Sequence, residues 1–340
     1  VEYINKIKNN YDICIVMGTG ERIAYLADLN YISYYVGRDI DAPRFKKNSR
    51  EIWFKTPLHK LNFLERKFYH NTFKNAIGHV AGVWVYPFLE KYTKNGIKMD
   101  MYAMDDELFK NTTHELDIQK TKFTFFSPQR MGNGKGTDLL WKALKICKTD
   151  FDILQVNWFD EATDEELKIR EQLLNELPSQ IKLIPMIKRK KMPEYYSFAD
   201  AVIGNMIVGT WELVDLEGVM CGKPVLSYSD PNHKLLVKGN YIQSSFLPDS
   251  NKPEDIAKII DKVVSSKEFR DELFENERKF VSNSTDKEWV SNWWDELFET
   301  FSQKYGKIHK NSSSISIKIR MGLFLIGNRL YWKKIKKLIK

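Results

Sequence analysis

Cysteine and metal-binding patterns are scarce in this chain. Its three cysteines, Cys14, Cys147 and Cys221, lie far apart in apolar stretches and form no paired spacing, so we predict reduced core residues in a cytoplasmic protein and no disulfide framework. The six histidines show no spacing typical of metal ligands either. We therefore predict that the protein uses no metal and no bound cofactor.

Long apolar runs are also missing. No segment approaches the roughly 20 apolar residues that span a bilayer, and no charged-then-apolar leader follows Val1. We therefore expect neither a transmembrane helix nor a signal peptide. Core-forming residues are abundant, because 43% of the 340 residues are hydrophobic and 13% are aromatic. Since single cores rarely grow beyond about 250 residues, we expect two domains.

Apolar strands alternate with amphipathic helices along most of the chain, which predicts parallel, doubly wound sheets. The first series has expected strands at 11–17, 31–36, 80–85 and 98–103. The second series has expected strands at 122–126, 153–156, 182–185, 202–204 and 225–228, and ends in helices at 253–265, 267–283 and 286–305. About four strands before residue 110 are few for such a domain, so we expect the first domain to be incomplete.

The segment AVIGNMIVGTWELVDLEGVMCGKPVLS, residues 201–227, has the order strand, acidic turn, helix, Gly-Lys-Pro and strand. Apolar residues at helical spacing place Glu217 one turn into the helix. The N-terminus of a helix suits anions, and a carboxylate nearby can accept hydrogen bonds from a sugar hydroxyl. The order favours a phosphate and ribose ligand, although an ordinary helix that ends at Gly222 and Pro224 is an equally open interpretation.

A second polar loop, SPQRMGNGKGTDLL, follows the strand that ends near Phe126. It places Arg130 and Lys135 around a glycine-rich turn that enters a helix at Thr137. Two cations near a helix start would bind a diphosphate, and the alternative is a surface loop with incidental basic residues. The loop is not a Walker motif, because Lys135 is followed by Gly136.

Together these segments resemble the donor-binding site of GT-B glycosyltransferases of the retaining nucleotide-sugar type, glycosyltransferase family four, or glycosyl transferases group 1. Residues 127–139 are similar to that family's Arg, Lys-Gly and Asp-Leu-Leu pattern, and residues 216–225 are similar to its Leu-Glu-Ala-Met-Ala-Cys-Gly-Lys-Pro-Val signature. The stretch PEYYSFAD, residues 193–200, is similar to its Tyr-Tyr and Ala-Asp helix. The resemblance covers most of the chain and implies an α/β fold of the GT-B type, with two Rossmann-like doubly wound domains and a cleft between them.

The resemblance also implies roles for single residues. Arg130 and Lys135 would be catalytic, because they would neutralise the donor diphosphate and the charge that develops on the leaving group, without a metal. Glu217 would hold the ribose hydroxyls, and backbone amides around residues 210–213 would contact the phosphates. The implied donor-binding set is Gly134, Gly209, Thr210, Trp211, Glu212, Leu213 and Glu217.

Two positions depart from the family pattern. A first Glu that contacts the donor sugar usually lies eight residues before the second, where this chain has Gly209, and Glu212 lies three residues later. The family's cleft histidine corresponds to Val36. These departures leave a second hypothesis open, in which the protein is a non-catalytic relative that acts as a binding or assembly subunit; a sugar-nucleotide epimerase is a third.

The first domain provides the acceptor-side candidates, which are Gly18, Gly37, Arg38, Asp39 and His79. His79 is either a polar contact or a core histidine, and the core interpretation is favoured. The predicted organisation is 1–118 for the incomplete N-terminal domain and 119–285 for the nucleotide-sugar domain, followed by a crossover helix at 286–306 and a basic amphipathic tail at 307–340.

The tail mixes apolar and aromatic residues with many Lys and Arg, as in ISIKIRMGLFLIGNRLYWKKIKKLIK at 315–340. Tyr331 and Trp332 suit the headgroup level of a membrane, and each cation near an anionic surface adds about 1 kcal/mol. Residues 315–340 therefore favour an anionic membrane surface, although a helix docked on the protein itself is an open alternative. No nucleic-acid motif is present. We predict a cytoplasmic glycosyltransferase, peripheral on the inner face of the membrane, that transfers sugar from a nucleotide sugar to a glycan or lipid-linked acceptor.

Overall fold

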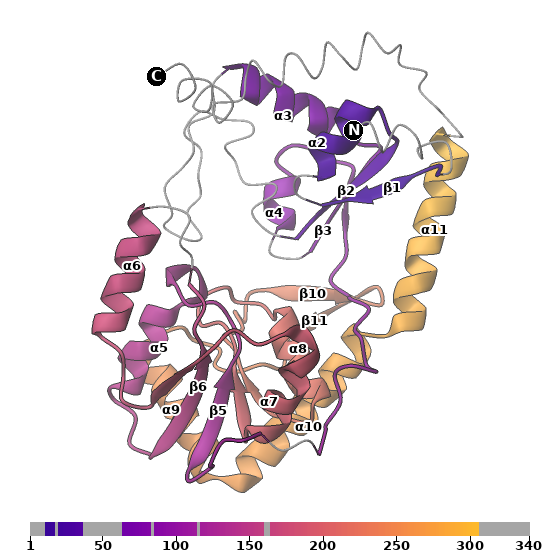
Figure 1. The fold of residues 1–340 in the computed structure, drawn as a ribbon. Helices are drawn as coiled ribbons and strands as arrows, with labels where there is room; N and C mark the ends of the chain where they lie inside the picture. The colour runs from indigo at the N-terminus through magenta and orange to yellow at the C-terminus, as the bar shows by residue number, and fades with distance from the viewer. Residues whose placement is uncertain are drawn as a thin grey trace, which may run out of the picture. The chain divides into compact units, whose positions relative to one another are not determined.

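The computed structural model describes residues 11–17, 20–36, 63–82, 85–113, 116–159 and 164–305. These residues form two compact units (Figure 1). The first unit holds the described residues up to Asp100 together with 288–305, and the second unit holds those of Met101–Lys287. Of the sequence predictions, those for Gly18, Gly37, Arg38, Asp39 and the tail at 307–340 lie outside the described residues.

The first unit contains a parallel sheet in the order β1-β2-β3-β4. Strand β2 is buried along almost its whole length because its sequence YISYY is aromatic and β-branched. Gly78 in β3 lies against Phe301 of α11, where an added Cβ would be 2.5 Å from the ring. The strands are Cys14–Val16, Tyr31–Tyr35, Gly78–Ala81 and Gly96–Lys98, and the helices are α2 (Gly20–Ala27), α3 (Phe63–Asn75), α4 (Tyr86–Leu89) and α11 (Lys287–Tyr305).

The second unit contains a five-stranded parallel sheet in the order β7-β6-β5-β8-β9. The chain starts in the central strand β5, moves outward to β6 and β7, and then returns to the other side of β5 as β8. In open α/β sheets, ligands bind at the carboxyl ends of the strands where the order reverses in this way. The strands are β5 (Phe123–Ser127), β6 (Phe151–Val156), β7 (Ile181–Ile184), β8 (Ala201–Ile203) and β9 (Val225–Leu226).

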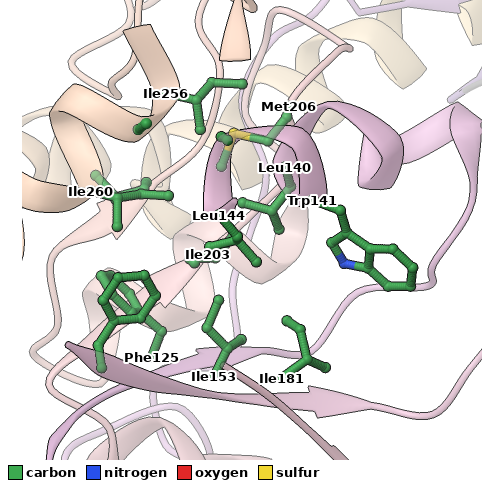
Figure 2. Packing of buried hydrophobic residues seen from close by; sticks show 14 of the residues in the cluster. Phe125, Leu140, Trp141, Leu144, Ile153, Ile181, Ile203, Met206, Ile256 and Ile260 are labelled. Carbon is green, nitrogen blue, oxygen red and sulfur yellow. The ribbon is translucent and has the colours of Figure 1, made fainter. Parts of the chain in front are cut away.

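Helices cover both faces of this sheet because side chains alternate along each strand. Ile203 joins Leu140 and Leu144 of α5 and Ile256 and Ile260 of α9 in one buried cluster (Figure 2). The neighbouring Val202 faces α8, where a Cβ on Gly218 would lie 3.1 Å from its side chain. The helices of this unit are α5 (Thr137–Leu144), α6 (Asp164–Asn175), α7 (Met192–Phe198), α8 (Leu213–Met220), α9 (Pro253–Ser265) and α10 (Lys267–Ser284), with short 3-10 turns η4 (Asn133–Lys135) and η5 (Arg189–Lys191).

The predicted α/β class, with two parallel sheets, is confirmed. The strands expected at 80–85 and 98–103 begin two residues earlier and end sooner, as β3 and β4, and α4 was not predicted. The antiparallel hairpin of β10 (Lys234–Val237) and β11 (Asn240–Gln243) was not predicted either. Its two-residue turn, Lys238-Gly239, has φ of 48° and 78°, which matches a type I′ turn. Among the described residues, no helix combines the length and apolar character needed to cross a membrane.

Candidate functional site

The loop after β5 carries Arg130 and Lys135 to the carboxyl edge of the second unit's sheet. It passes through η4 and reaches α5 through Gly136, which is left-handed at φ 70°. The backbone of Met206 comes so close that a Cβ on Gly136 would lie 2.9 Å from its carbonyl carbon. Only glycine at position 136 therefore allows this loop to turn against the neighbouring one. Gly134, a predicted donor-binding residue, lies inside η4.

The loop after β8 is tied to the first loop by two hydrogen bonds. The Met206 amide donates to the Lys135 carbonyl at 2.9 Å, and the Gln129 side-chain amide donates to the Gly204 carbonyl. Both loops follow strands that are neighbours at the switch point, so the fold places them side by side. This brings Lys135 close to the start of α8, and the resemblance assigns both to the donor site.

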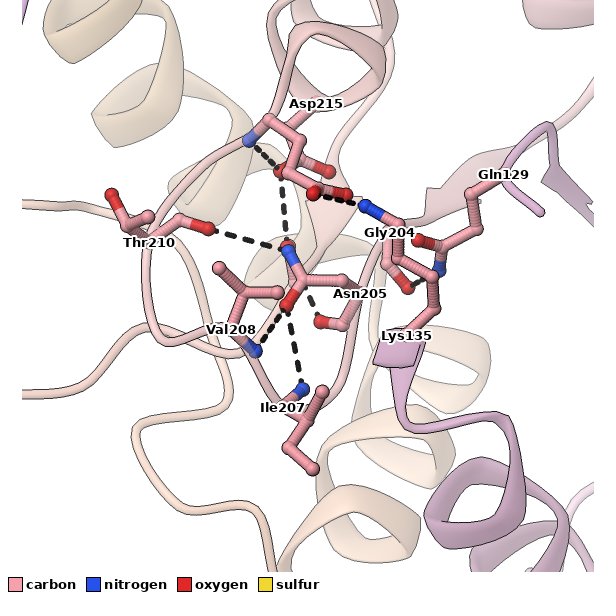
Figure 3. Close-up of polar contacts among 10 residues, drawn as sticks. Gln129, Lys135, Gly204, Asn205, Ile207, Val208, Thr210 and Asp215 are labelled. Carbon is pink, nitrogen blue, oxygen red and sulfur yellow. Dashed lines mark hydrogen bonds and ion pairs between the residues drawn. The ribbon is translucent and has the colours of Figure 1, made fainter. Parts of the chain in front are cut away.

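Asn205 organises the second loop from inside (Figure 3). Its fully buried side chain accepts from the Val208 amide at 2.7 Å and donates to the Thr210 carbonyl at 3.3 Å. A buried amide with partners on both its oxygen and its nitrogen fixes the path of the backbone around it. Asn205 therefore shapes the segment that presents residues 209–213, and the sequence analysis did not identify it.

Glu212 lies at the N-cap of α8 and forms an ion pair with Lys135. Its own amide donates to the carboxylate of Asp215 at 2.6 Å. The side chains of Lys135 and Glu212 are 21% and 22% exposed, so the pair is reachable from solvent. The structure thus brings together a predicted catalytic cation and the predicted donor-binding N-terminus of α8.

Asp215 is a buried carboxyl in the first turn of α8. Burial raises its pKa to about 8, and the charge of Glu212 adds to this, while the Glu212 amide, Ser227 and Lys135 oppose it. The Ser227 hydroxyl donates to it at 3.0 Å. Gly204 is required beside it, because a Cβ there would lie 2.0 Å from one carboxylate oxygen. The start of α8 therefore holds a carboxyl that is largely protonated near neutral pH.

Glu217 lies further along α8, with a side chain only 3% exposed. Arg189 of η5 pairs with one carboxylate oxygen at 2.8 Å, and the Tyr196 hydroxyl donates to the other at 2.9 Å. Burial raises the pKa of Glu217, whereas Tyr196 and Arg189 act against this shift. Glu217 was predicted from the sequence, whereas its partners Arg189 and Tyr196 were not.

The remaining predicted donor-side residues differ in their surroundings. The Arg130 guanidinium lies over the ring of Trp158, 5.7 Å from its centre, and Trp158 follows β6 with 45% of its surface exposed. Trp211 is buried and packs edge-on against Tyr102 at 5.0 Å, Thr210 is buried, and Leu213 is 47% exposed. Arg130 thus stays at the carboxyl edge with an aromatic platform that the sequence analysis missed.

Gly209 has a physical reason to lack a side chain. Its φ is +78°, and a Cβ there would lie 2.9 Å from the Cβ of Asp230 and 3.3 Å from the ring of Tyr228. The Asp230 amide also donates to the Gly209 carbonyl at 2.9 Å. The carboxylate that the resemblance places at this position therefore has no room in this chain.

His79 is the one acceptor-side candidate among the described residues, and it is buried in the first unit. Its Nδ1 lies 3.1 Å from the Tyr35 hydroxyl, and its ring stacks on Phe73 at 4.1 Å. Tyr35 also donates to the buried carboxylate of Glu21 at 3.0 Å. His79 thus belongs to a buried polar network on the first sheet.

The described residues contain no group of three or more His, Cys, Asp or Glu side chains arranged to hold a metal ion. The side chains gathered around Lys135 and α8 are instead suited to an anion with a hydroxyl-bearing group attached. Lys135 and Arg130 supply positive charge, the start of α8 supplies backbone amides, and Glu217 supplies acceptor oxygens.

A sequence model of the family described as glycosyl transferases group 1 matches residues 109–280, about half of the chain. The matched region contains Arg130, Lys135 and Glu217. No curated protein sequence matches this chain.

Solved structures resemble this chain over most of its length. HepE from Anabaena, solved with UDP and glucose, is 16% identical with a TM-score of 0.63, and the match covers 88% of this chain and 81% of that one. Sucrose-phosphate synthase from Thermosynechococcus elongatus is 14% identical with a TM-score of 0.64, and the match covers 89% of this chain and 76% of that one. TarM from S. aureus, solved with UDP, alpha-GlcNAc-glycerol and Fondaparinux, is 12% identical with a TM-score of 0.57, and the match covers 87% of this chain and 57% of that one. The predicted GT-B fold is confirmed.

Proposed function

Because the chain belongs to the glycosyl transferases group 1 family, we propose that it transfers a sugar from a nucleoside diphosphate sugar to a glycan or lipid-linked acceptor, with retention of configuration and without a metal. The observation that carries this proposal is the meeting of Lys135 with the N-terminus of α8 at the switch point of the sheet. HepE with UDP-glucose and TarM with UDP are structural neighbours, which supports a nucleotide sugar as donor.

The proposed chemistry is electrostatic. Breaking the bond between sugar and diphosphate leaves a negative charge on the departing phosphate oxygen, which Lys135 and Arg130 would stabilise together with the amides at the start of α8. This stabilisation grows toward the transition state, so it lowers the barrier instead of merely strengthening binding. Glu212 now holds Lys135, and the diphosphate, with its larger charge, would displace that single carboxylate.

Turnover of nucleotide sugars by the wild type and by Lys135→Gln tests the proposal. We expect the substitution to lower kcat by about 10²–10³-fold, because that is the usual effect of removing one such group. The matched control is Lys142→Gln on the outer face of α5, where the side chain is 61% exposed, and this variant should keep wild-type activity. Equal turnover by the wild type and Lys135→Gln would overturn the assigned role. The anomeric configuration of the product, read by NMR, tests retention separately.

We place the protein on the inner face of a membrane through residues 315–340, with no role in nucleic-acid binding. Residues 307–340 contain ten Lys and Arg and no Asp or Glu. The other 306 residues therefore hold 43 basic and 45 acidic side chains, a formal net charge of −2. A net positive charge that is confined to residues 307–340, in a segment that also contains Trp and Tyr, suits an anionic lipid surface.

A non-catalytic relative is the second candidate function. It is favoured by Gly209, whose backbone admits no side chain, and by Glu212, which neutralises Lys135. Such a protein would bind nucleoside diphosphates without consuming nucleotide sugars. Detectable turnover that Lys135→Gln abolishes would exclude it.

A further inference from the structure

Arg189 reaches Glu217 from a different part of the sheet edge. It lies in η5, the next element after β7, while Glu217 lies in α8, the next helix after β8. The pair joins a guanidinium that is 60% exposed to a carboxylate that is 3% exposed. The cation is therefore the exposed partner of the pair, and several of its five N–H donors stay available beyond the single contact to Glu217.

An aromatic support fixes the position of this guanidinium. The ring of Phe109 lies 4.7 Å from its central carbon, and Phe109 packs edge-on against Tyr196 at 6.3 Å. Both rings are buried. A cation over an aromatic face is held in place. Phe109 therefore fixes the Arg189 guanidinium by stacking, while one of its nitrogens binds Glu217.

Together, Arg189 and Tyr196 determine how the carboxylate of Glu217 can be used. Each of its two oxygens already accepts one hydrogen bond, and a carboxylate oxygen has lone pairs for another. The pair is also electrically neutral, so it does not repel a diphosphate nearby, whereas an unpaired carboxylate would.

We propose that Arg189 is the positioning residue of the ribose subsite: it holds the Glu217 carboxylate so that its remaining lone pairs accept the hydroxyls of a ribonucleoside, and thereby sets the preference for ribose over deoxyribose. This inference rests on the proposed function, in which Glu217 binds the ribose of the donor. Arg189 acts through Glu217, so its loss affects donor binding and KM more than kcat.

The test is calorimetric titration of the full chain with UDP, GDP, ADP and CDP, each compared with its 2′-deoxy counterpart. In the wild type we expect the ribonucleotide of the selected base to bind about tenfold more tightly than its deoxy analogue, which corresponds to one hydrogen bond to a charged group. Arg189→Gln should reduce this preference to about twofold, because the ribonucleotide loses more affinity than the deoxy analogue. Arg189→Lys should retain part of the preference, because it keeps the charge but not the planar fork.

A neighbouring residue supplies the control. Lys190 is exposed in the same 3-10 turn, so Lys190→Gln makes the same charge change without altering the Glu217 pair. This variant should keep the wild-type preference.

A pH series separates positioning from an effect on ionisation alone. The titratable and charged groups that interact with Glu217 are Arg189, Tyr196 and Cys221. Removing the cation raises the pKa of Glu217 further, so the carboxyl of Arg189→Gln is protonated over a wider range. Because the carboxylate has also lost the group that positions it, the ribose preference should stay low as the pH is raised; a preference that returned at high pH would overturn the inference.

The outcomes distinguish the inference from the function on which it rests. If Glu217→Gln leaves the ribose preference intact, or no nucleoside diphosphate binds, the proposed donor site is wrong. If Glu217→Gln abolishes the preference but Arg189→Gln does not, the inference alone is overturned. An equal loss of affinity for ribo and deoxy ligands in Arg189→Gln would also overturn it, since Arg189 would then act on the phosphates.

Discussion

The raised pKa of Asp215, at the start of α8, makes the stability of the folded protein depend on pH. Its pKa is about 8 in the folded protein against an ordinary value of 3.8. Between these two values the folded protein holds a proton that the unfolded chain has lost, so the free energy of unfolding falls as the pH rises through this window. We expect the melting temperature of the wild type to fall by several degrees between about pH 5 and pH 9.

Asp215→Asn isolates this contribution, because the amide keeps the size of the side chain and cannot titrate. The melting temperature of the variant should fall less than that of the wild type over the same pH range. Glu277, another buried carboxyl with a raised pKa, is present in both proteins. Asp150→Asn is a suitable control, since that side chain is 74% exposed. Parallel pH profiles for the wild type and Asp215→Asn would contradict the assignment.

Residues with a local spacing signature could be predicted from the sequence, and residues brought together only by the fold could not. Lys135 and Glu217 stand in glycine-rich and Gly-Lys-Pro contexts that are readable along the chain. Arg189 is one cation in the run Lys188–Lys191, and nothing local marks it as the partner of a carboxylate 28 positions away. The pairing of Glu212 with Lys135, 77 positions apart, is equally invisible before the strands are ordered.

At the scale of elements, the turn into α5 depends on a left-handed glycine. Gly136 and Gly239 have φ of +70° and +78°, but a Cβ on Gly136 would meet the backbone of Met206 at 2.9 Å, whereas one on Gly239 would meet nothing within 4 Å. Gly239→Ala should therefore cost about 1 kcal/mol from backbone strain alone. Gly136→Ala should cost about 3 kcal/mol, because the backbone of Met206 cannot move aside without strain.

Urea unfolding of the two variants measures this difference. The free energy of unfolding should fall more in Gly136→Ala than in Gly239→Ala, with similar slopes against urea concentration. Equal losses would show that the loop after β8 gives way to the added methyl group. In that case the two loops would not be held as closely as the Met206 to Lys135 hydrogen bond indicates.

Regular elements were predictable where hydrophobic periodicity was strong. The predicted helix at 253–265 coincides with α9, and the predicted strand at 153–156 lies within β6. The hairpin of β10 and β11 was not predicted, because its strands KLLV and NYIQ are short and the hairpin begins and ends with polar residues. A type I′ turn requires positive φ at both central residues, and the usual sequences for it are Asn-Gly and Asp-Gly. Lysine rarely adopts positive φ, so Lys238-Gly239 does not indicate such a turn.

At the scale of the whole molecule, the separation of charge leads to a prediction about membranes. Residues 307–340 carry ten cations, and the rest of the chain has a formal net charge of −2. A vesicle with anionic lipid should therefore bind the full chain through the tail, and a vesicle of neutral phosphatidylcholine should bind it much more weakly. Since surface charges are screened by salt, binding should weaken as the ionic strength rises.

Charge substitution tests which part of the chain is responsible, without shortening it. Replacing four tail lysines by Gln should lower vesicle affinity at least tenfold, since each cation adds about 1 kcal/mol; these are Lys333, Lys334, Lys336 and Lys337. The control makes the same change in net charge at four exposed lysines elsewhere, namely Lys110, Lys142, Lys145 and Lys267. If attraction depended on net charge alone, both variants would lose affinity equally, and the tail would have no special role. A loss confined to the tail variant, in a co-sedimentation assay with vesicles of one-third phosphatidylglycerol, would instead assign membrane binding to these residues.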